Sequence, residues 1–185
     1  STRKGFSLTD NKGERAITVV GDRLQPRFND NLNWNLLNDV DGIFITAGDK
    51  EIIKKARSAK IICASPRIGL EVINESKVLL DCLIGSNLDP GESYELKELN
   101  IKPKLVIKTE GKDGGIIFPG GRYSAEKNMN PIIDSYGCGD SFAAGILYGL
   151  TSEWHIENTI KLGKVLGRNC SEHFGPYPSM EKIFL

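Results

Sequence analysis

Residues 134–150 read DSYGCGDSFAAGILYGL. A polar turn that contains Gly137 and Gly139 runs directly into apolar residues at helical spacing, which predicts a helix beginning close to Asp140. Two glycines ahead of a helix let the backbone turn sharply and approach a ligand closely. The N–H groups of the first helical turn, with the positive end of the helix dipole, then form an anion-binding site.

Asp140 lies within this predicted anion site, and its carboxylate has two interpretations. It can cap the helix by accepting backbone N–H bonds. It can also take a proton from a hydroxyl that attacks a phosphate, while the surrounding amides hold the transferred charge. The residues alone leave both interpretations open.

The segment resembles the C-terminal signature of the ribokinase-like (PfkB) carbohydrate kinases, Asp-Thr-x-Gly-Ala-Gly-Asp followed by a helix of small residues. Ser135 and Cys138 depart from the commonest form, and both are small. The resemblance implies that Asp140 is the catalytic base. It also implies that the N–H groups of Gly137, Cys138 and Gly139 form an anion hole, and that ATP and Mg2+ are the cofactors.

Composition indicates an ordinary globular protein of one domain. The 185 residues are 39% hydrophobic and 26% charged, and 24 basic residues balance 24 acidic ones, so we expect neither nucleic acid nor a membrane as partner. Apolar runs stay below the roughly 20 residues that span a bilayer, and no apolar signal segment precedes the first strand. Four cysteines lack CxxC spacing and two histidines lack i, i+4 spacing. We therefore expect buried thiols in a reducing cytoplasm rather than disulfides or a zinc site.

Residues 1–27 alternate apolar and polar side chains around the turn Asp10-Asn11-Lys12-Gly13, which predicts two antiparallel strands. A hairpin that only decorates the surface would show the same alternating pattern. Residues 13–18, GERAIT, resemble the "GERTIT" segment of the family's lid sheet over the sugar. The resemblance implies that residues 1–27 are part of the β lid and that residues 28–185 form the α/β nucleotide-binding core.

From about residue 34 short apolar runs alternate with helical patterns. The expected strands are 42–46, 61–64, 78–84, 105–109 and 115–118, and the expected helices are 49–59, one starting at Ser65-Pro66, one after Asp140, and 153–170. This alternation predicts an α/β fold with a largely parallel sheet covered on both faces. The resemblance specifies the three-layer αβα ribokinase-like fold. In such sheets ligands bind beyond the C-terminal ends of the strands.

Asn87 follows the third expected strand in the segment GSNLDPGE. An Asn in such a place often only stabilises a turn by bonding the nearby backbone. The segment resembles the family's Asn-x-x-Glu motif, which helps to place magnesium and the nucleotide phosphates. Asn87 matches this motif, but Pro90 occupies the Glu position. Asp89 or Glu92 is the candidate metal residue in its place, since Mg2+ needs only one or two carboxylates.

Lys108, at the end of the fourth expected strand, begins the segment KTEGKDGG. The segment resembles the family's Thr-x-Gly-x-x-Gly turn, which lies along ATP, and Thr109, Gly111 and Gly114 match it. As an isolated pattern it is also typical of any glycine-rich turn between strands.

The last expected helix carries Gly163 and Gly167, ends near Asn169, and is followed by Gly175. In relatives this helix and the following glycine form a wall of the adenine pocket. The two helical glycines either let a flat base approach or allow helix–helix contact. In relatives the Asp134 turn and the loop near Gly175 also bind a monovalent cation such as K+.

The resemblance implies an ATP-dependent kinase that phosphorylates a hydroxyl of a sugar or sugar-like small molecule. A nucleoside or inositol kinase of the same superfamily is the first alternative. The second is a non-catalytic nucleotide-binding regulatory protein on this fold, motivated by Pro90 and by the short N-terminus. Full-length relatives are longer at that end, so we interpret the chain as a fragment that lacks most sugar-contacting residues. Exposed edges of the lid strands favour a homodimer through the lid.

Overall fold

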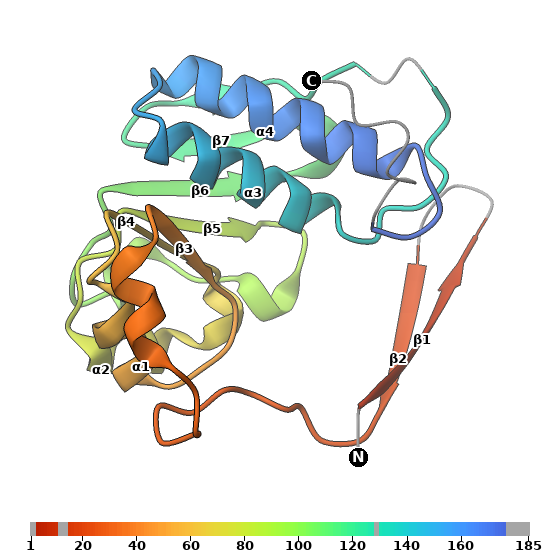
Figure 1. Ribbon diagram of the computed structural model, residues 1–185. Helices are drawn as coiled ribbons and strands as arrows, with labels where there is room; N and C mark the ends of the chain where they lie inside the picture. Colours follow the sequence, from red (N-terminus) through yellow and green to blue (C-terminus); the bar gives the residue numbers. More distant parts are fainter. Residues whose placement is uncertain (1–2, 11–14, 128–129, 177–185) are drawn as a thin grey trace.

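The computed structural model describes residues 3–10, 15–127 and 130–176. Its main body is a six-stranded sheet in the order β3-β4-β5-β6-β7-β8 (Figure 1). The strands from β3 to β6 are parallel, whereas β6–β7 and β7–β8 pair antiparallel. The strand bounds are β3 Gly42–Ile45, β4 Ile61–Ala64, β5 Cys82–Ser86, β6 Leu105–Thr109, β7 Gly115–Phe118 and β8 Arg122–Tyr123. The largely parallel sheet expected from the sequence is confirmed.

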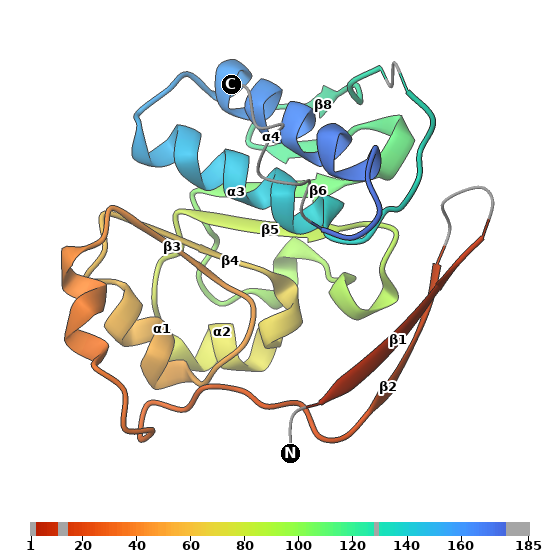
Figure 2. The same cartoon turned by 45° about the vertical axis from the view of Figure 1, so that its right-hand side comes forward.

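Four helices cover the two faces of this sheet, as Figure 2 shows. They are α1 Lys50–Ala56, α2 Leu70–Ser76, α3 Cys138–Thr151 and α4 Ile156–Ser171. Successive residues of the central strands face opposite sides: Ile62 joins the core cluster that contains α1 and α2 residues, and Cys63 joins the cluster that contains α3 and α4 residues. Two separate apolar cores therefore lie on the two faces of the sheet, which is the three-layer arrangement expected.

The starts of α1, α2 and β5 agree with the sequence-based predictions to different degrees. The Asp49 carboxylate accepts the N–H groups of Glu51 and Ile52 at 3.0 Å, so the predicted cap of α1 is confirmed. The helix predicted from Ser65-Pro66 is divided, because Gly69 has a φ of 98° and separates a 3-10 turn from α2. The sheet strand predicted from residue 78 begins at Cys82 instead.

The last helix also begins later than predicted, at Ile156 rather than near Glu153. Glu153 has a φ of 59°, a left-handed conformation that a helix cannot continue. None of the helices in the described part of the chain is long and apolar enough to cross a membrane.

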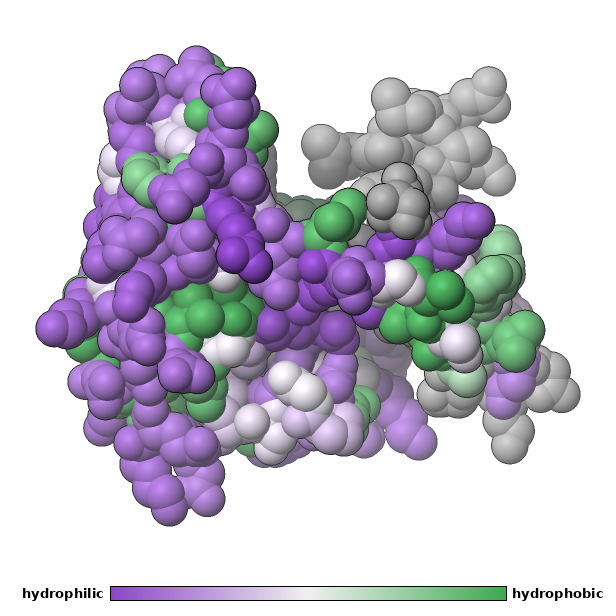
Figure 3. All heavy atoms as spheres, turned by 90° about the horizontal axis from the view of Figure 1, so that it is seen from below, coloured by the Kyte–Doolittle hydropathy of each residue, from purple (hydrophilic) through white to green (hydrophobic). Residues whose placement is uncertain are grey.

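The predicted hairpin is present as β1, Lys4–Thr9, and β2, Arg15–Val20, which pair antiparallel. The predicted turn falls largely on residues 11–14, outside the described residues. The hairpin projects away from the main sheet (Figures 1 and 2). Its large apolar side chains are exposed, and Figure 3 shows them gathered on the projecting part at the right. These are Phe6, Leu8, Ile17, Val19 and Val20.

Candidate active site

The start of α3 depends on Gly137, the N-cap residue, which has a φ of 85°. A Cβ atom at this position would lie 2.6 Å from the Cβ of Pro176 in the segment after α4. A side chain would therefore be strained by the backbone and would also collide with that segment. The Ser141 N–H donates to the Gly137 carbonyl at 2.8 Å and closes the first helical turn. The Cys138 N–H donates to the Ser135 carbonyl at a long 3.4 Å. The N-terminal end of α3 is a place where an anion is favoured.

Asp134 fastens this turn to the end of α4. Its carboxylate is buried and accepts the N–H groups of Tyr136 at 2.9 Å and Gly175 at 3.0 Å. The N–H groups of Ile133 and Asp134 both donate to the Ser171 carbonyl. The structure thus brings the Asp134 turn and the Gly175 loop together, which are the two segments that the resemblance links to a monovalent cation.

Asp140 is the third residue of α3, and its side chain is exposed. Helix α3 has no side-chain capping bond, since its N-cap is a glycine, so the carboxylate does not serve as the cap. Asp140 directly follows Gly139, which lines the neighbouring cavity. The carboxylate therefore lies in the field of the helix N-terminus, one residue beyond the cavity lining.

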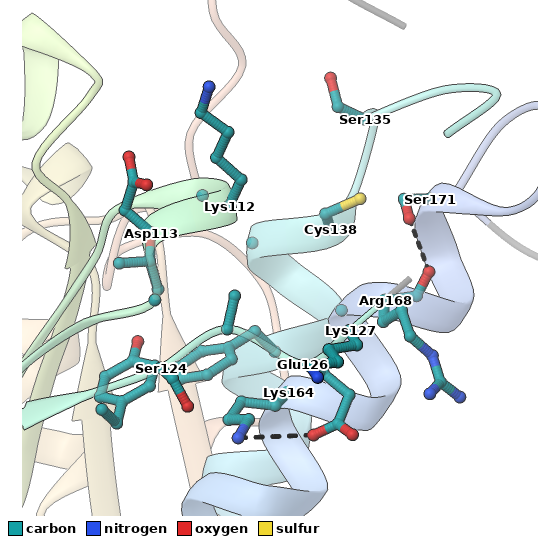
Figure 4. A pocket seen from close by; sticks show the side chains of 18 of the residues that line it. Lys112, Asp113, Ser124, Glu126, Lys127, Ser135, Cys138, Lys164, Arg168 and Ser171 are labelled. Atoms are coloured by element: carbon teal, nitrogen blue, oxygen red, sulfur yellow. Dashed lines mark hydrogen bonds and ion pairs between the residues drawn. The ribbon is translucent and has the colours of Figure 1, made fainter. Parts of the chain in front are cut away.

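A cavity of about 560 Å³ opens between the β6–β7 turn, residues 123–127, the start of α3 and one side of α4 (Figure 4). Five residues predicted for the site line it: Thr109, Gly111, Gly114, Cys138 and Gly139. The other predicted residues lie outside its lining: Asn87, Lys108, Asp89, Glu92, Gly137, Asp140, Asn169 and Gly175. This cavity therefore contains only part of the site that was predicted from the sequence.

The β6–β7 turn uses glycine where the backbone requires it. Gly111 and Gly114 have φ values of 59° and 87°, and a Cβ at Gly114 would lie 2.0 Å from the Tyr123 carbonyl oxygen. Lys108 points elsewhere, because its ammonium donates to the Tyr94 carbonyl at 2.7 Å and lies 4.1 Å from the Tyr94 ring centroid. Tyr94 belongs to the core on the α1 and α2 side, so Lys108 faces away from the cavity.

Asn87 joins the turn after β5 to the turn after β6. Its backbone N–H donates to the Thr109 carbonyl at 2.9 Å, and its side-chain amide donates to Glu110 at 2.9 Å. Asn87 therefore fixes the position of the β6–β7 turn relative to β5, and its amide nitrogen is already bonded.

Arg67, which the sequence interpretation missed, binds both candidate metal carboxylates. Its Nε pairs with Glu92 and its Nη2 pairs with Asp89. The second oxygen of Glu92 accepts the Ser86 N–H at 2.7 Å, at the end of β5. Burial opposes the charge of Arg67, but the pKa of its guanidinium is raised by the Glu92 hydrogen bond and by the carboxylates of Glu92, Asp89 and Asp140. Asp140 therefore lies close enough for its charge to act on Arg67.

The position of Arg67 could have been anticipated in part. It follows β4, and polar residues after parallel strands meet at one edge of the sheet. Within residues 3–10, 15–127 and 130–176, no group of three or more His, Cys, Asp or Glu side chains could hold a metal ion.

Helix α4 supplies the basic side of the cavity. Lys164 pairs with Glu126 at 3.4 Å, and Figure 4 shows both side chains at the same end of the cavity. Arg168 also lines the cavity and donates to the Asn169 side-chain oxygen at 2.8 Å. Neither Lys164 nor Glu126 was singled out by the sequence, because a charged residue on a helix or in a loop is usually a solvated one.

The two glycines of α4 both lie against α3. A Cβ at Gly145 of α3 would lie 2.8 Å from the Gly163 backbone, so Gly163 belongs to the α3–α4 contact. Gly167 lines the cavity and also lies against α3, where its Cβ would be 3.3 Å from the Cys138 carbonyl oxygen. Helix–helix contact therefore accounts for both glycines, and the approach of a flat base at Gly167 stays a prediction.

Comparisons with known proteins agree with this arrangement. A family model described as "pfkB family carbohydrate kinase" matches residues 85–183, more than half of the chain. The chain belongs to the pfkB family of carbohydrate kinases. Within this family it is 28% identical over 113 residues to a 5-dehydro-2-deoxygluconokinase of Clostridium botulinum (strain Eklund 17B / Type B), a match that covers 57% of this chain and 32% of the relative.

Two solved structures show the fold of this pfkB-family chain. A probable sugar kinase protein from Rhizobium etli CFN 42 superposes with a TM-score of 0.72, and an adenosine kinase from Sinorhizobium meliloti with a TM-score of 0.74. Each is 18% identical, and each match covers 97% of this chain and 63% of the solved one. The fold is therefore the ribokinase-like fold. The chain spans less than two thirds of the length of these relatives.

Proposed function

We propose that the protein containing this chain is an ATP-dependent kinase that phosphorylates a hydroxyl of a sugar or sugar-like small molecule. The observation that carries the proposal is the start of α3. Gly137 makes a turn that a side chain would strain, Asp140 is exposed in the first turn of the helix, and the start of the helix borders a cavity bounded by the glycine turn of Gly111 and Gly114. Membership of the pfkB family supports ATP and a divalent metal as cofactors.

Each part of the proposed site has a chemical role. Asp140 would orient the acceptor hydroxyl and take its proton. The N–H groups of Gly137, Cys138 and Gly139, with the α3 dipole, would hold charge on the transferred phosphoryl group. Phosphoryl transfer needs placement and charge stabilisation more than covalent chemistry, so one carboxylate and a set of amides are sufficient.

The residues of the β5 turn do not form a ready-made magnesium site. Asp89 and Glu92 are both paired with Arg67, and the Asn87 amide is bonded to Glu110. Direct coordination by Asp89 or Glu92 stays a prediction that would require Arg67 to release them. We derive no step through a metal held by the protein.

The test is ADP release from ATP and magnesium by the full gene product, across a panel of sugars, polyols and nucleosides. Strong stimulation by one compound, abolished in Asp140→Asn, supports the kinase and gives its substrate class. The matched control is Glu71→Gln, which changes a carboxylate in the first turn of α2, on the other face of the sheet. No stimulation by any compound, with ATP still bound, would contradict the kinase proposal.

The acceptor class distinguishes the leading proposal from the nearest alternative. The matching proteins include both a 5-dehydro-2-deoxygluconokinase and an adenosine kinase, so a nucleoside or inositol acceptor requires the same site and a different panel result. The regulatory alternative is motivated by Pro90 and by the pairing of Asp89 and Glu92 with Arg67. It predicts tight ATP binding without transfer to any acceptor.

The remaining proposals concern assembly and location. The exposed apolar residues of the β1–β2 hairpin support its assignment, with residues 1–27, to a lid, and support a homodimer through that lid. Sedimentation of Leu8→Glu, expected to be monomeric, against the unchanged protein tests the dimer. None of the four cysteines is joined in a disulfide, which agrees with the proposed cytoplasmic location. Fractionation of cells tests it.

A further inference from the structure

The four cysteines form two pairs in contrasting surroundings. Cys63 and Cys82 are register partners on neighbouring strands β4 and β5, and both have an exposed fraction of 0%. Cys138 and Cys170 lie at the start of α3 and near the end of α4. Cys138 lines the cavity, whereas Cys170 is buried behind it with an exposed fraction of 3%. A small solute in the cavity therefore reaches Cys138 directly, and reaches neither Cys63 nor Cys82.

The sulfur atoms of Cys138 and Cys170 share one small site around the Asp134–Gly137 turn. The Cys138 Sγ lies 3.9 Å from the Asp134 carbonyl oxygen. The Cys170 Sγ lies 3.2 Å from the Tyr136 carbonyl oxygen, and 3.6 Å from where a Cβ of Gly137 would be. Figure 4 shows the Cys138 side chain pointing toward the last turn of α4, the turn that carries Ser171. Both sulfur atoms therefore lie against backbone carbonyls of the same Asp134–Gly137 turn.

The surroundings of Cys170 favour its thiolate. Hydrogen bonding by the Cys138 thiol, helped by the Ser141 hydroxyl, lowers the pKa of Cys170 to about 6, although burial and the nearby carboxylates of Asp134 and Asp140 oppose this. A lowered pKa favours the thiolate of Cys170, which is typical of a reactive dithiol. At the other pair, burial raises the pKa of Cys82. The contrast indicates one reactive pair and one inert pair.

We propose that Cys138 and Cys170 are a peroxide-oxidised dithiol site, which closes to a disulfide and disables the anion-binding turn of α3. Cys138, the sulfur exposed to the cavity, passes its proton to Cys170 and attacks hydrogen peroxide. The O–O bond breaks, Cys138 becomes a sulfenic acid, and the hydroxide that leaves takes the proton back from Cys170 to form water. The Cys170 thiolate then attacks that sulfur, the S–O bond breaks, and a second hydroxide leaves and takes a proton from solvent. One thiol, one thiolate, one peroxide and one solvent proton yield one disulfide and two waters, with two electrons passing from sulfur to oxygen.

The disulfide has a direct consequence for the turn. A sulfur–sulfur bond is about 2.0 Å long, much shorter than a hydrogen-bonded contact between thiols. Its formation draws the first residue of α3 toward the end of α4 and redirects the N–H groups of Cys138 and Gly139. The chemistry of the bond does not depend on the proposed kinase function, whereas the expected loss of nucleotide binding rests on it.

Peptide mapping tests the bond itself without any substitution. Trypsin places the four cysteines in four different peptides: 61–67, 78–97, 128–161 and 169–182. After brief treatment with hydrogen peroxide and alkylation without reductant, we expect peptides 128–161 and 169–182 to be joined, and peptides 61–67 and 78–97 to be alkylated singly once the protein is unfolded. Dithiothreitol should separate the joined peptides. Absence of that join, or equal joining of the other two peptides, would overturn the proposal.

Nucleotide binding tests the consequence, with Cys170→Ala as the matched variant. ATP affinity of the full gene product should fall at least about tenfold on oxidation and return with dithiothreitol, and Cys170→Ala should be insensitive to peroxide. Unchanged affinity in a protein that carries the mapped disulfide would overturn the effect on the turn. Absence of ATP binding in both redox forms would instead count against the proposed function. The peptide map would still show whether the disulfide forms. If Cys170→Ala does not fold, reversal by dithiothreitol in the unchanged protein is the decisive comparison.

Discussion

Two turns lie at the same edge of the sheet and differ in how their charges are used. The turn at residues 134–140 matches the family signature and leaves Asp140 exposed at the start of α3. The turn at residues 86–92 departs from the family motif at Pro90, and its carboxylates are paired with Arg67. The first turn presents the Asp140 carboxylate outward and buries only Asp134, whereas the second pairs both Asp89 and Glu92 with Arg67. We infer that the first turn serves the chemistry and the second holds the site in shape.

The largest effect on stability is expected at Gly137. Gly137→Ala should lower the free energy of unfolding by about 2–4 kcal/mol, because alanine resists the left-handed backbone and its Cβ would crowd Pro176. Denaturant unfolding measures this.

The neighbouring Gly139 provides the control. A Cβ there meets nothing within 4 Å, so Gly139→Ala should be neutral or stabilising by up to about 1 kcal/mol. Equal losses in the two variants would contradict the special role of Gly137.

The second prediction concerns the anchor of the same turn. Asp134→Asn should cost about 2 kcal/mol, because the buried carboxylate accepts the N–H groups of Tyr136 and Gly175 and the charge strengthens both bonds. The same unfolding measurement on Asp113→Asn, which alters an exposed carboxylate, should show little change. A negligible loss of stability in Asp134→Asn would show that this carboxylate does not anchor the turn to the end of α4.

The third prediction concerns the other turn. Arg67→Gln should cost about 1 kcal/mol, because Glu92 loses its partner, and the value is modest because the guanidinium is half exposed. Arg67→Lys should restore part of the loss by retaining the charge. A loss as large as that of Gly137→Ala would show that the β5 turn matters more to the fold than its position suggests.

The fourth prediction is a pH dependence at the first turn. The pKa of Cys170 is lowered in the folded protein, so its thiolate contributes stability that is fully present at about pH 9 and is lost as the pH falls to about 6. The unchanged protein should therefore gain stability relative to Cys170→Ala between pH 6 and pH 9. Parallel pH profiles for the two proteins would contradict the lowered pKa.

The sequence predicted those features of the fold that depend on residues close together in the chain. Gly137, the start of α3 and the cap at Asp49 follow from turn and capping chemistry within a few residues. The β-strands follow from short apolar runs, although β5 begins later than its apolar run, because Leu80 is buried and Val78 packs against the core without either belonging to the sheet, and Leu79 is exposed.

What the sequence could not predict depends on contacts between distant residues. The pairing of Arg67 with Glu92 joins two loops 25 residues apart, and the contact of Lys108 with Tyr94 turns a predicted cofactor residue to the other face of the sheet. The cavity wall at Glu126 and Lys164 arises from the packing of a loop on α4, which has no local pattern.

The most direct test of the contrast between the two turns is the turnover number of two isosteric variants of the full gene product. Asp140→Asn should reduce kcat by about 10²–10⁴-fold while ATP still binds, because the proton acceptor is lost. Glu92→Gln should change kcat by less than about tenfold, because that carboxylate holds Arg67 rather than the substrate. Near-normal turnover in Asp140→Asn, or a larger loss in Glu92→Gln, would contradict the account.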